Sequence, residues 1–197
     1  MSNVRQHLSH PPPSLLFLLE YRLRSIEIGR LALGYTTSWE QTPTISILFD
    51  GKQVIEGTAT AFTNPAIECA VIHCRALLEF LGLGGKSETE LKELTIRRKS
   101  DDAAVELYGN LPKVSIQRAV SFYPGAAAEA EEALAYVVYL ANKGLAHTTT
   151  SFTKHDRGSV LLDIAFRGVV TLVVEGFFAP LHIKPPSLKL QFRKRVA

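Results

Sequence analysis

Asn142, Lys143 and His147 form the first of three polar clusters whose side chains could do chemistry. If this stretch ends a helix, Lys143 and His147 are four positions apart and lie on one face, with Asn142 beside them. An imidazole can act as an acid or a base near neutrality, and a cation one turn away can hold a phosphate next to it. The alternative is that both residues end the helix, where a positive charge complements the helix dipole. The spacing leaves both interpretations open.

Arg75 is the second candidate, because it lies between apolar neighbours in the middle of a predicted helix. A guanidinium in such a place can bind a phosphate or a carboxylate. The interpretation that we favour is a structural ion pair, for example with Glu20 or Glu27 of the first predicted helix. Next to it, we expect His73 to be a core or surface histidine without a functional role.

The third cluster, His155 and Arg157, follows a run of hydroxyl residues just before the last predicted helix. Together they could bind a phosphate at the entry to that helix, although Asp156 between them can be no more than the N-cap. No set of His, Cys, Asp and Glu residues has the spacing of metal ligands. We therefore expect neither a metal ion nor a cofactor.

Four segments have the apolar periodicity of helices that would position these clusters. The first follows three consecutive prolines, and proline is favoured at the start of a helix. Asn64 as N-cap and Pro65 at the first helical position predict the start of the second. The predicted helices cover about 14–34, 65–81, 125–147 and 159–181.

The rest of the chain is less regular. Alternating apolar residues on both sides of Asp50-Gly51 predict a hairpin over about 45–55. Residues 86–123 read as an irregular insertion, and the basic tail 184–197 alternates in a way that predicts an extended strand, which could pair with 45–49. The fold class is therefore mainly α: a single domain over 1–197 with a four-helix bundle core and a small β hairpin and extended-strand appendage.

The predicted helix 159–181 is long and apolar enough to raise the question of a membrane span. Asp163, Arg167 and Glu175 lie within it, and three charges make insertion costly, so we expect a buried helix and no membrane. The N-terminal apolar run has no small-residue cleavage site, which argues against a signal peptide. Cys69 and Cys74 would point to different sides of one helix and cannot bridge, which suits a reducing cytoplasm.

Most sequence motifs of known chemistry are missing. There is no phosphate-binding loop, no dinucleotide fingerprint after a strand, no HExxH, no paired CxxC and no GxSxG. These absences argue against P-loop hydrolases, dinucleotide oxidoreductases, zinc proteases and serine hydrolases. A net charge of +3 does not by itself predict a nucleic-acid binder.

The late polar element resembles the motif of the HEPN superfamily of small prokaryotic helical domains. That motif is an arginine, usually a polar residue, three variable residues and a histidine. Here Lys143 takes the polar place and His147 the final one, whereas Asn142 stands where the family has its arginine. A tyrosine that some members carry two residues later is Thr149. Lys143 or Arg75 would have to supply the missing positive charge.

The resemblance implies a homodimer with two such histidines facing one cleft, and an antitoxin-type or other protein partner. It also implies metal-independent ribonuclease chemistry, in which an RNA 2′-hydroxyl attacks the adjacent phosphodiester. His147 would be the general acid or base, and Lys143 or Arg75 would stabilise the charge on the phosphate. The basic tail would attract the RNA or nucleotide.

The rival hypothesis is a non-catalytic helical bundle that binds a protein or a small ligand. The apolar segment 159–181 favours an interface, and the arginine missing from the motif favours a loss of catalysis. A ligand pocket among the helices near Arg75 is the other form of this hypothesis.

Overall fold

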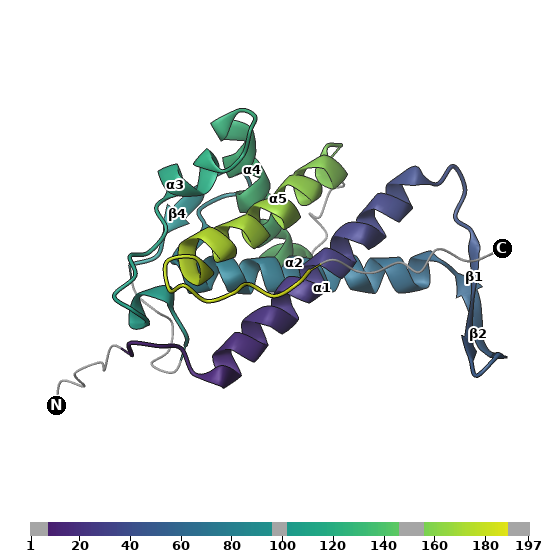
Figure 1. Ribbon diagram of the computed structural model, residues 1–197. Coiled ribbons are helices and arrows are strands. Elements are labelled where there is room, and N and C mark those ends of the chain that lie inside the picture. The colour runs from purple at the N-terminus through teal and green to yellow at the C-terminus, as the bar shows by residue number, and fades with distance from the viewer. Residues whose placement is uncertain (1–7, 96–101, 146–155, 189–197) are drawn as a thin grey trace.

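The computed structural model describes residues 8–95, 102–145 and 156–188 (Figure 1). Within these residues the protein is mainly helical, as the sequence predicts, and carries two small antiparallel strand pairs, of which the sequence predicts one. The helices pack against one another: α2 and α5 each contact the other three long helices, namely α1, α4 and each other. The α-helices are α1 (Pro13–Ser38), α2 (Thr60–Leu81), α3 (Ile116–Ser121), α4 (Ala127–Tyr139) and α5 (Gly158–Val173).

Helices α1 and α2 run in opposite directions and make the closest helix pair of the fold (Figure 1). Gly29 marks the closest approach, because a Cβ built there would lie 2.3 Å from Cβ of Ala70 and 2.8 Å from the carbonyl oxygen of Ala66. Glycine is thus the residue that lets the two backbones meet. The first half of α1 consequently lies beside the second half of α2.

Helix α1 extends four residues past the predicted end at Gly34. The hydroxyl groups of its last turn donate to backbone carbonyls of the preceding turn, for example Thr36 Oγ1 to the oxygen of Ala32 at 2.9 Å. Such bonds hold hydroxyl residues in a helix end. The solvent face of α1 is also apolar, with Phe17, Tyr21, Ile28 and Tyr35 exposed.

Helix α2 begins at Thr60, so the predicted start at Asn64 and Pro65 is wrong. Pro65 lies inside the helix, where it costs one backbone hydrogen bond, and the chain before it continues the helical path back to the hairpin. The predicted end is confirmed. Gly82 takes a left-handed conformation with φ of 93°, and its N–H donates to carbonyl oxygens of the last turn.

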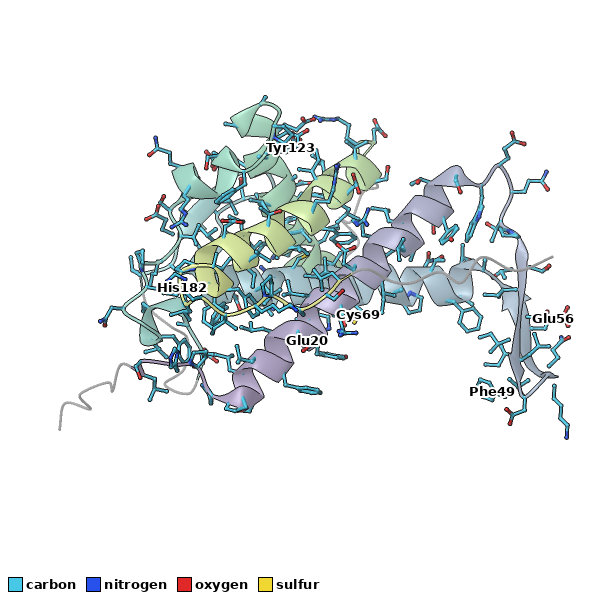
Figure 2. All side chains as sticks on the ribbon, in the orientation of Figure 1. Glu20, Phe49, Glu56, Cys69, Tyr123 and His182 are labelled. Carbon is cyan, nitrogen blue, oxygen red and sulfur yellow. The ribbon has the colours of Figure 1, made fainter. Side chains whose placement is uncertain are left out.

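The predicted hairpin is confirmed as β1 (Thr44–Phe49) paired with β2 (Lys52–Thr58). Asp50 and Gly51 both have positive φ, which is the turn geometry that suits a tight hairpin. The hairpin leaves the far ends of α1 and α2, and side chains such as Phe49 and Glu56 project away from the helices (Figures 1 and 2). Residues 184–188 form no strand, and 189–197, the rest of the predicted strand, lie outside the described residues.

Two helices end in π-helical turns. Helix α4 continues as Leu140–Leu145 (η2), and α5 continues as Val174–Phe178 (η3). The helices predicted over 125–147 and 159–181 are therefore present as far as the structure describes them, but the first begins two residues later and the second ends three residues earlier than predicted. Asp163 and Arg167 pair with each other on the exposed side of α5. Among the described residues, no helix is long and apolar enough to cross a membrane.

The region predicted as an irregular insertion, 86–123, contains short elements. Strand β4 (Leu91–Glu93) pairs with β3 (Leu83–Gly85), which lies just before this region, and a 3-10 turn η1 (Val105–Leu107) precedes α3. Residues 96–101 within it are not described. The backbone N–H of Val114 donates to the carbonyl oxygen of Leu81 at 2.9 Å, which fastens the segment to the end of α2.

The hydrophobic core lies where α1, α2, α4 and α5 meet. Phe177 is fully buried and makes edge-to-face contacts with Phe80, Tyr108 and Phe178 at centroid distances of 5.2, 6.0 and 5.4 Å. This aromatic cluster joins the end of α5 to the end of α2 and to the segment after η1. It thereby fixes the elements that surround the cleft described next.

Candidate functional site

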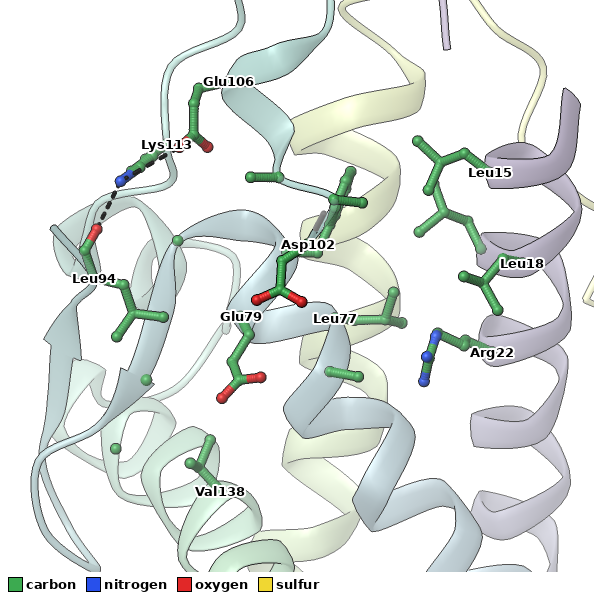
Figure 3. A pocket seen from close by; sticks show the side chains of 18 of the residues that line it. Leu15, Leu18, Arg22, Leu77, Glu79, Leu94, Asp102, Glu106, Lys113 and Val138 are labelled. Carbon is green, nitrogen blue, oxygen red and sulfur yellow. Dashed lines mark hydrogen bonds and ion pairs between the residues drawn. The ribbon is translucent and has the colours of Figure 1, made fainter. Parts of the chain in front are cut away.

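A cleft of about 660 Å³ opens between the first half of α1, the second half of α2 and the segment 102–113 (Figure 3). Strands β3 and β4 and the end of α4 also contribute residues to its lining. The volume falls in the range of small-molecule sites, roughly 300–1,000 Å³. The size and its position among the helices make this cleft the candidate functional site.

One wall of the cleft is apolar. This wall consists of Leu15, Leu18 and Leu19 of α1 together with Leu77 and Phe80 of α2. Leu18 is 40% exposed, whereas the other four side chains are buried. Such a wall favours the apolar part of a ligand, because each methylene group that leaves water contributes about 0.8 kcal/mol.

Arg22 lies at the lower end of this wall, one turn beyond Leu18 and Leu19 (Figure 3). Its guanidinium donates to Nδ1 of His73 with 2.9 Å between the nitrogen atoms. Because a guanidinium only donates, the other ring nitrogen of His73 carries the proton and the imidazole is neutral. Burial lowers the pKa of Arg22 from its ordinary value. It also lowers the pKa of His73, and the positive charge of Arg22 adds to that effect.

His73 is almost fully buried, with 8% of its surface exposed. Its Nε2 atom has no hydrogen-bond partner among the residues that the structure describes. The ring lies edge-on to Tyr21, with 5.3 Å between the centroids. These contacts leave the imidazole with one anchored nitrogen, and that anchor is Arg22.

Carboxylates occupy the middle of the cleft. Glu79 of α2 and Asp102 both point into it (Figure 3). Behind Glu79, Arg75 donates to its Oε1 at 3.0 Å. The charge of Glu79 is therefore balanced from within its own helix.

At the other end of the cleft, Lys113 joins two parts of the lining (Figure 3). Its Nζ donates to the carbonyl oxygen of Leu94 at 2.8 Å and lies 3.5 Å from Oε1 of Glu106. The second carboxylate oxygen of Glu106 is buried and lacks a partner in the described part of the chain. This end is polar, opposite to the leucine wall.

The structure brings together only part of the three clusters named from the sequence. Asn142 lines the cleft, and Lys143 next to it is exposed. Both lie in the π-helical turn η2, so the predicted place at a helix end is confirmed. His147 and His155 lie outside the described residues.

Arg75 and Arg157 are both in ion pairs. The partner of Arg75 is Glu79, so the suggested pairing with Glu20 or Glu27 is wrong; those two glutamates pair within α1, with Arg24 and Arg30. Their spacing of four and three positions explains the preference for partners on the same helix. Arg157, before α5, pairs with two glutamates of α4, Glu129 and Glu132.

Sequence reasoning missed most of the residues that line the cleft. His73 was expected to have no role, and no role was predicted for Arg22, Glu79 or the charged residues of 102–113. Position 22 did carry a signal, because it follows Leu15, Leu18 and Leu19 on the buried side of an amphipathic helix. The residues of 102–113 carry no such signal in the sequence. Their position depends on how an irregular segment packs against the helices, which no local pattern predicts.

In the ranges 8–95, 102–145 and 156–188, no group of three or more His, Cys, Asp or Glu side chains could hold a metal ion. No protein-family model matches this chain, and comparisons with curated proteins and with solved structures give no match either.

Proposed function

We propose that this protein is a non-catalytic ligand-binding module whose cleft takes up a small organic molecule. The observation that carries the proposal is the lining of the cleft, in which one leucine-rich wall faces charged side chains of both signs across a single space of about 660 Å³. Small-molecule sites are typically apolar with a few polar groups that fix the orientation of the ligand.

The charged groups support binding more than catalysis. Glu79 and Glu106 are each held by a cation of the protein, Arg75 and Lys113. His73, the group best suited to move a proton near neutrality, is buried and has Nδ1 occupied by Arg22. A general base needs a nitrogen within reach of the substrate. Here Arg22 lines the cleft and His73 does not, so the guanidinium lies between the imidazole and the cleft.

Filling the cleft tests the proposal. Ala76 lines the cleft and is half-buried, so Ala76→Trp is expected to occupy the space without disturbing the core. Ile72 lies one turn earlier on α2 and is 49% exposed, which makes Ile72→Trp the matched control. With the uncharged dye Nile red as the probe, we expect fluorescence enhancement by the wild type and by Ile72→Trp, and its loss in Ala76→Trp. Equal enhancement by all three proteins would contradict the proposal.

A second candidate function is the handling of an RNA or nucleotide phosphate, with His147 as general acid or base. It is supported by the π-helical turn η2, which brings Asn142 to the cleft and leaves Lys143 exposed beside it. Single π-turns are frequent at functional sites. RNA cleavage in EDTA, lost in His147→Ala, would establish this function. Absence of cleavage by the folded wild type would exclude it.

For the assembly, we propose a homodimer in the cytoplasm, built on a four-helix bundle of α1, α2, α4 and α5. The support for a dimer is the exposed apolar stripe of α1, formed by Phe17, Tyr21, Ile28 and Tyr35. Several large apolar side chains exposed on one helix face favour an interaction site. Sedimentation velocity is expected to show a dimer that Tyr21→Glu dissociates. A wild-type monomer would contradict it.

A further inference from the structure

Arg22 differs from the other arginines whose contacts the structure describes in the helices around the cleft. Arg24, Arg30 and Arg75 each pair with a glutamate on the same helix. Within the described parts of the chain, Arg22 has no carboxylate at salt-bridge distance, and its one hydrogen bond goes to a neutral imidazole. A half-buried cation that lines a cleft and has no counterion is expected to take one from a ligand.

The geometry around Arg22 prepares it for that role. The bond to His73 uses one of the five N–H donors of the guanidinium. His73 is itself fixed between α1 and α2 by burial and by its edge-on contact with Tyr21. His73 thus holds the guanidinium on one side, and the remaining N–H donors can point into the cleft. Their planar, forked arrangement matches the two oxygens of a carboxylate.

The surroundings of Arg22 also restrict the body of the ligand. Leu18, one turn before Arg22, and Leu77 on the opposite helix form an apolar surface beside the guanidinium (Figure 3). Leu19 also lines this part of the cleft. Glu79 and Asp102 face the same space from the other side. Arg75 is already paired with Glu79, and Lys113 with Glu106. A single negative charge, which needs only Arg22, therefore fits this lining better than a polyanion such as a nucleoside triphosphate.

We propose that Arg22 is the anion-binding residue of the cleft and that the ligand class is an amphipathic monocarboxylate, with its carboxylate on the guanidinium and its apolar body along the leucine wall. This inference rests on the proposed ligand-binding function and adds the chemical class of the ligand. His73 acts as a positioning residue, because it holds the guanidinium and does not reach the ligand.

Two probes with the same body separate the charge from the apolar contact. Decanoate carries the carboxylate, and decan-1-ol lacks it. By isothermal titration calorimetry at pH 7.5, we expect the wild type to bind decanoate about 10- to 100-fold more tightly than decanol, which is the range for hydrogen bonds to charged groups. In Arg22→Met this preference is expected to disappear while decanol still binds.

Arg24→Met is the matched control, since Arg24 lies on the same helix, is exposed and does not line the cleft. It should keep the full preference for decanoate. Arg22→Lys retains the charge without the fork and should keep only part of the preference. This second variant also guards against misreading a misfolded Arg22→Met, which circular dichroism would reveal.

The failure of this inference can be told apart from the failure of the proposed function. Equal affinity of the wild type for decanoate and decanol, with Nile red enhancement still lost only in Ala76→Trp, overturns the role of Arg22 and leaves the ligand-binding module intact. A preference that survives in Arg22→Met overturns it too. If neither probe binds, the monocarboxylate class is wrong, and the Nile red comparison of Ala76→Trp with Ile72→Trp decides separately on the cleft.

Discussion

His73 of α2 accepts a hydrogen bond from Arg22 of α1, with 2.9 Å between Nδ1 and the guanidinium nitrogen, and the pair links the two helices beside the cleft. Burial, and secondly the charge of Arg22, lowers the pKa of His73 below its usual 6.5. The unfolded chain therefore binds a proton at this position more readily than the folded protein does. Stability from this group is complete above about pH 6.5 and is lost as the pH falls through and below that value.

We therefore predict that the free energy of unfolding falls between pH 7.5 and pH 5.5, and that His73→Gln reduces this fall. Urea denaturation of both proteins at the two pH values measures the difference. Because the two proteins differ only at position 73, only the difference between their two pH dependences is assigned to His73. If the two proteins lose the same stability, His73 is not responsible.

Gly29 and Gly34 of α1 are predicted to respond to alanine with opposite signs. A Cβ at Gly29 would lie 2.3 Å from Cβ of Ala70, whereas one at Gly34 would meet nothing within 4 Å. We expect Gly29→Ala to destabilise the protein by about 1–3 kcal/mol or more through overpacking. Gly34→Ala should stabilise it by about 0.5–1 kcal/mol, because alanine favours the helix. Thermal unfolding of the two variants checks this, and equal shifts would refute the close approach.

Phe177 and Phe17 form a second matched pair. Phe177 is completely buried and contacts three other aromatic rings, whereas Phe17 is 74% exposed. Phe177→Ala is expected to cost about 3–5 kcal/mol from lost burial and the cavity it leaves. Phe17→Ala should change the unfolding free energy of the monomer by no more than about 0.5 kcal/mol. Denaturation at low protein concentration, where a dimer would dissociate, gives both values.

The two free cysteines should differ in reactivity. Cys74 is fully buried, and burial raises the pKa of its thiol well above the usual value. Cys69, one turn and a half earlier on α2, is only partly buried. Because the thiolate is the reactive form, we expect a thiol reagent at pH 8 to modify Cys69 alone in the native protein and both residues in denaturant. Rapid modification of Cys74 without denaturant would contradict the packing of α2.

The helices could be predicted from the sequence where apolar periodicity and end signals agree. Gly82 ends α2 as its residue type suggests, and Asp50-Gly51 makes the turn of the hairpin. The start of α2 could not be predicted, since Asn64-Pro65 is a strong local start signal. Strand β2 ends at Thr58 and the helix begins at Thr60, so the connection to the hairpin outweighs the local start signal at Asn64-Pro65.

The cleft was largely beyond the reach of sequence reasoning because its residues come from distant segments. Of the predicted site residues that the structure describes, Asn142 alone lines the cleft. Arg75 shows why residue type alone misleads: a guanidinium in an apolar helix suggests a ligand, but Glu79, four positions later, takes its charge. Arg22 has the same chemistry without such a neighbour, and this difference becomes visible only when the partners are in place.

The close contact of Gly29 with Ala70 also determines how the cleft could change its width. Leu19 lies ten residues from that contact along α1, a distance of about 15 Å at 1.5 Å per residue. A rotation of α1 by about 5° around the contact would therefore move Leu19 by roughly 1.3 Å. In such a rotation the glycine contact would be the pivot, with the hairpin on one side of it and the leucine wall on the other. Substitutions near the hairpin, far from any ligand, would then adjust how wide a molecule the cleft admits.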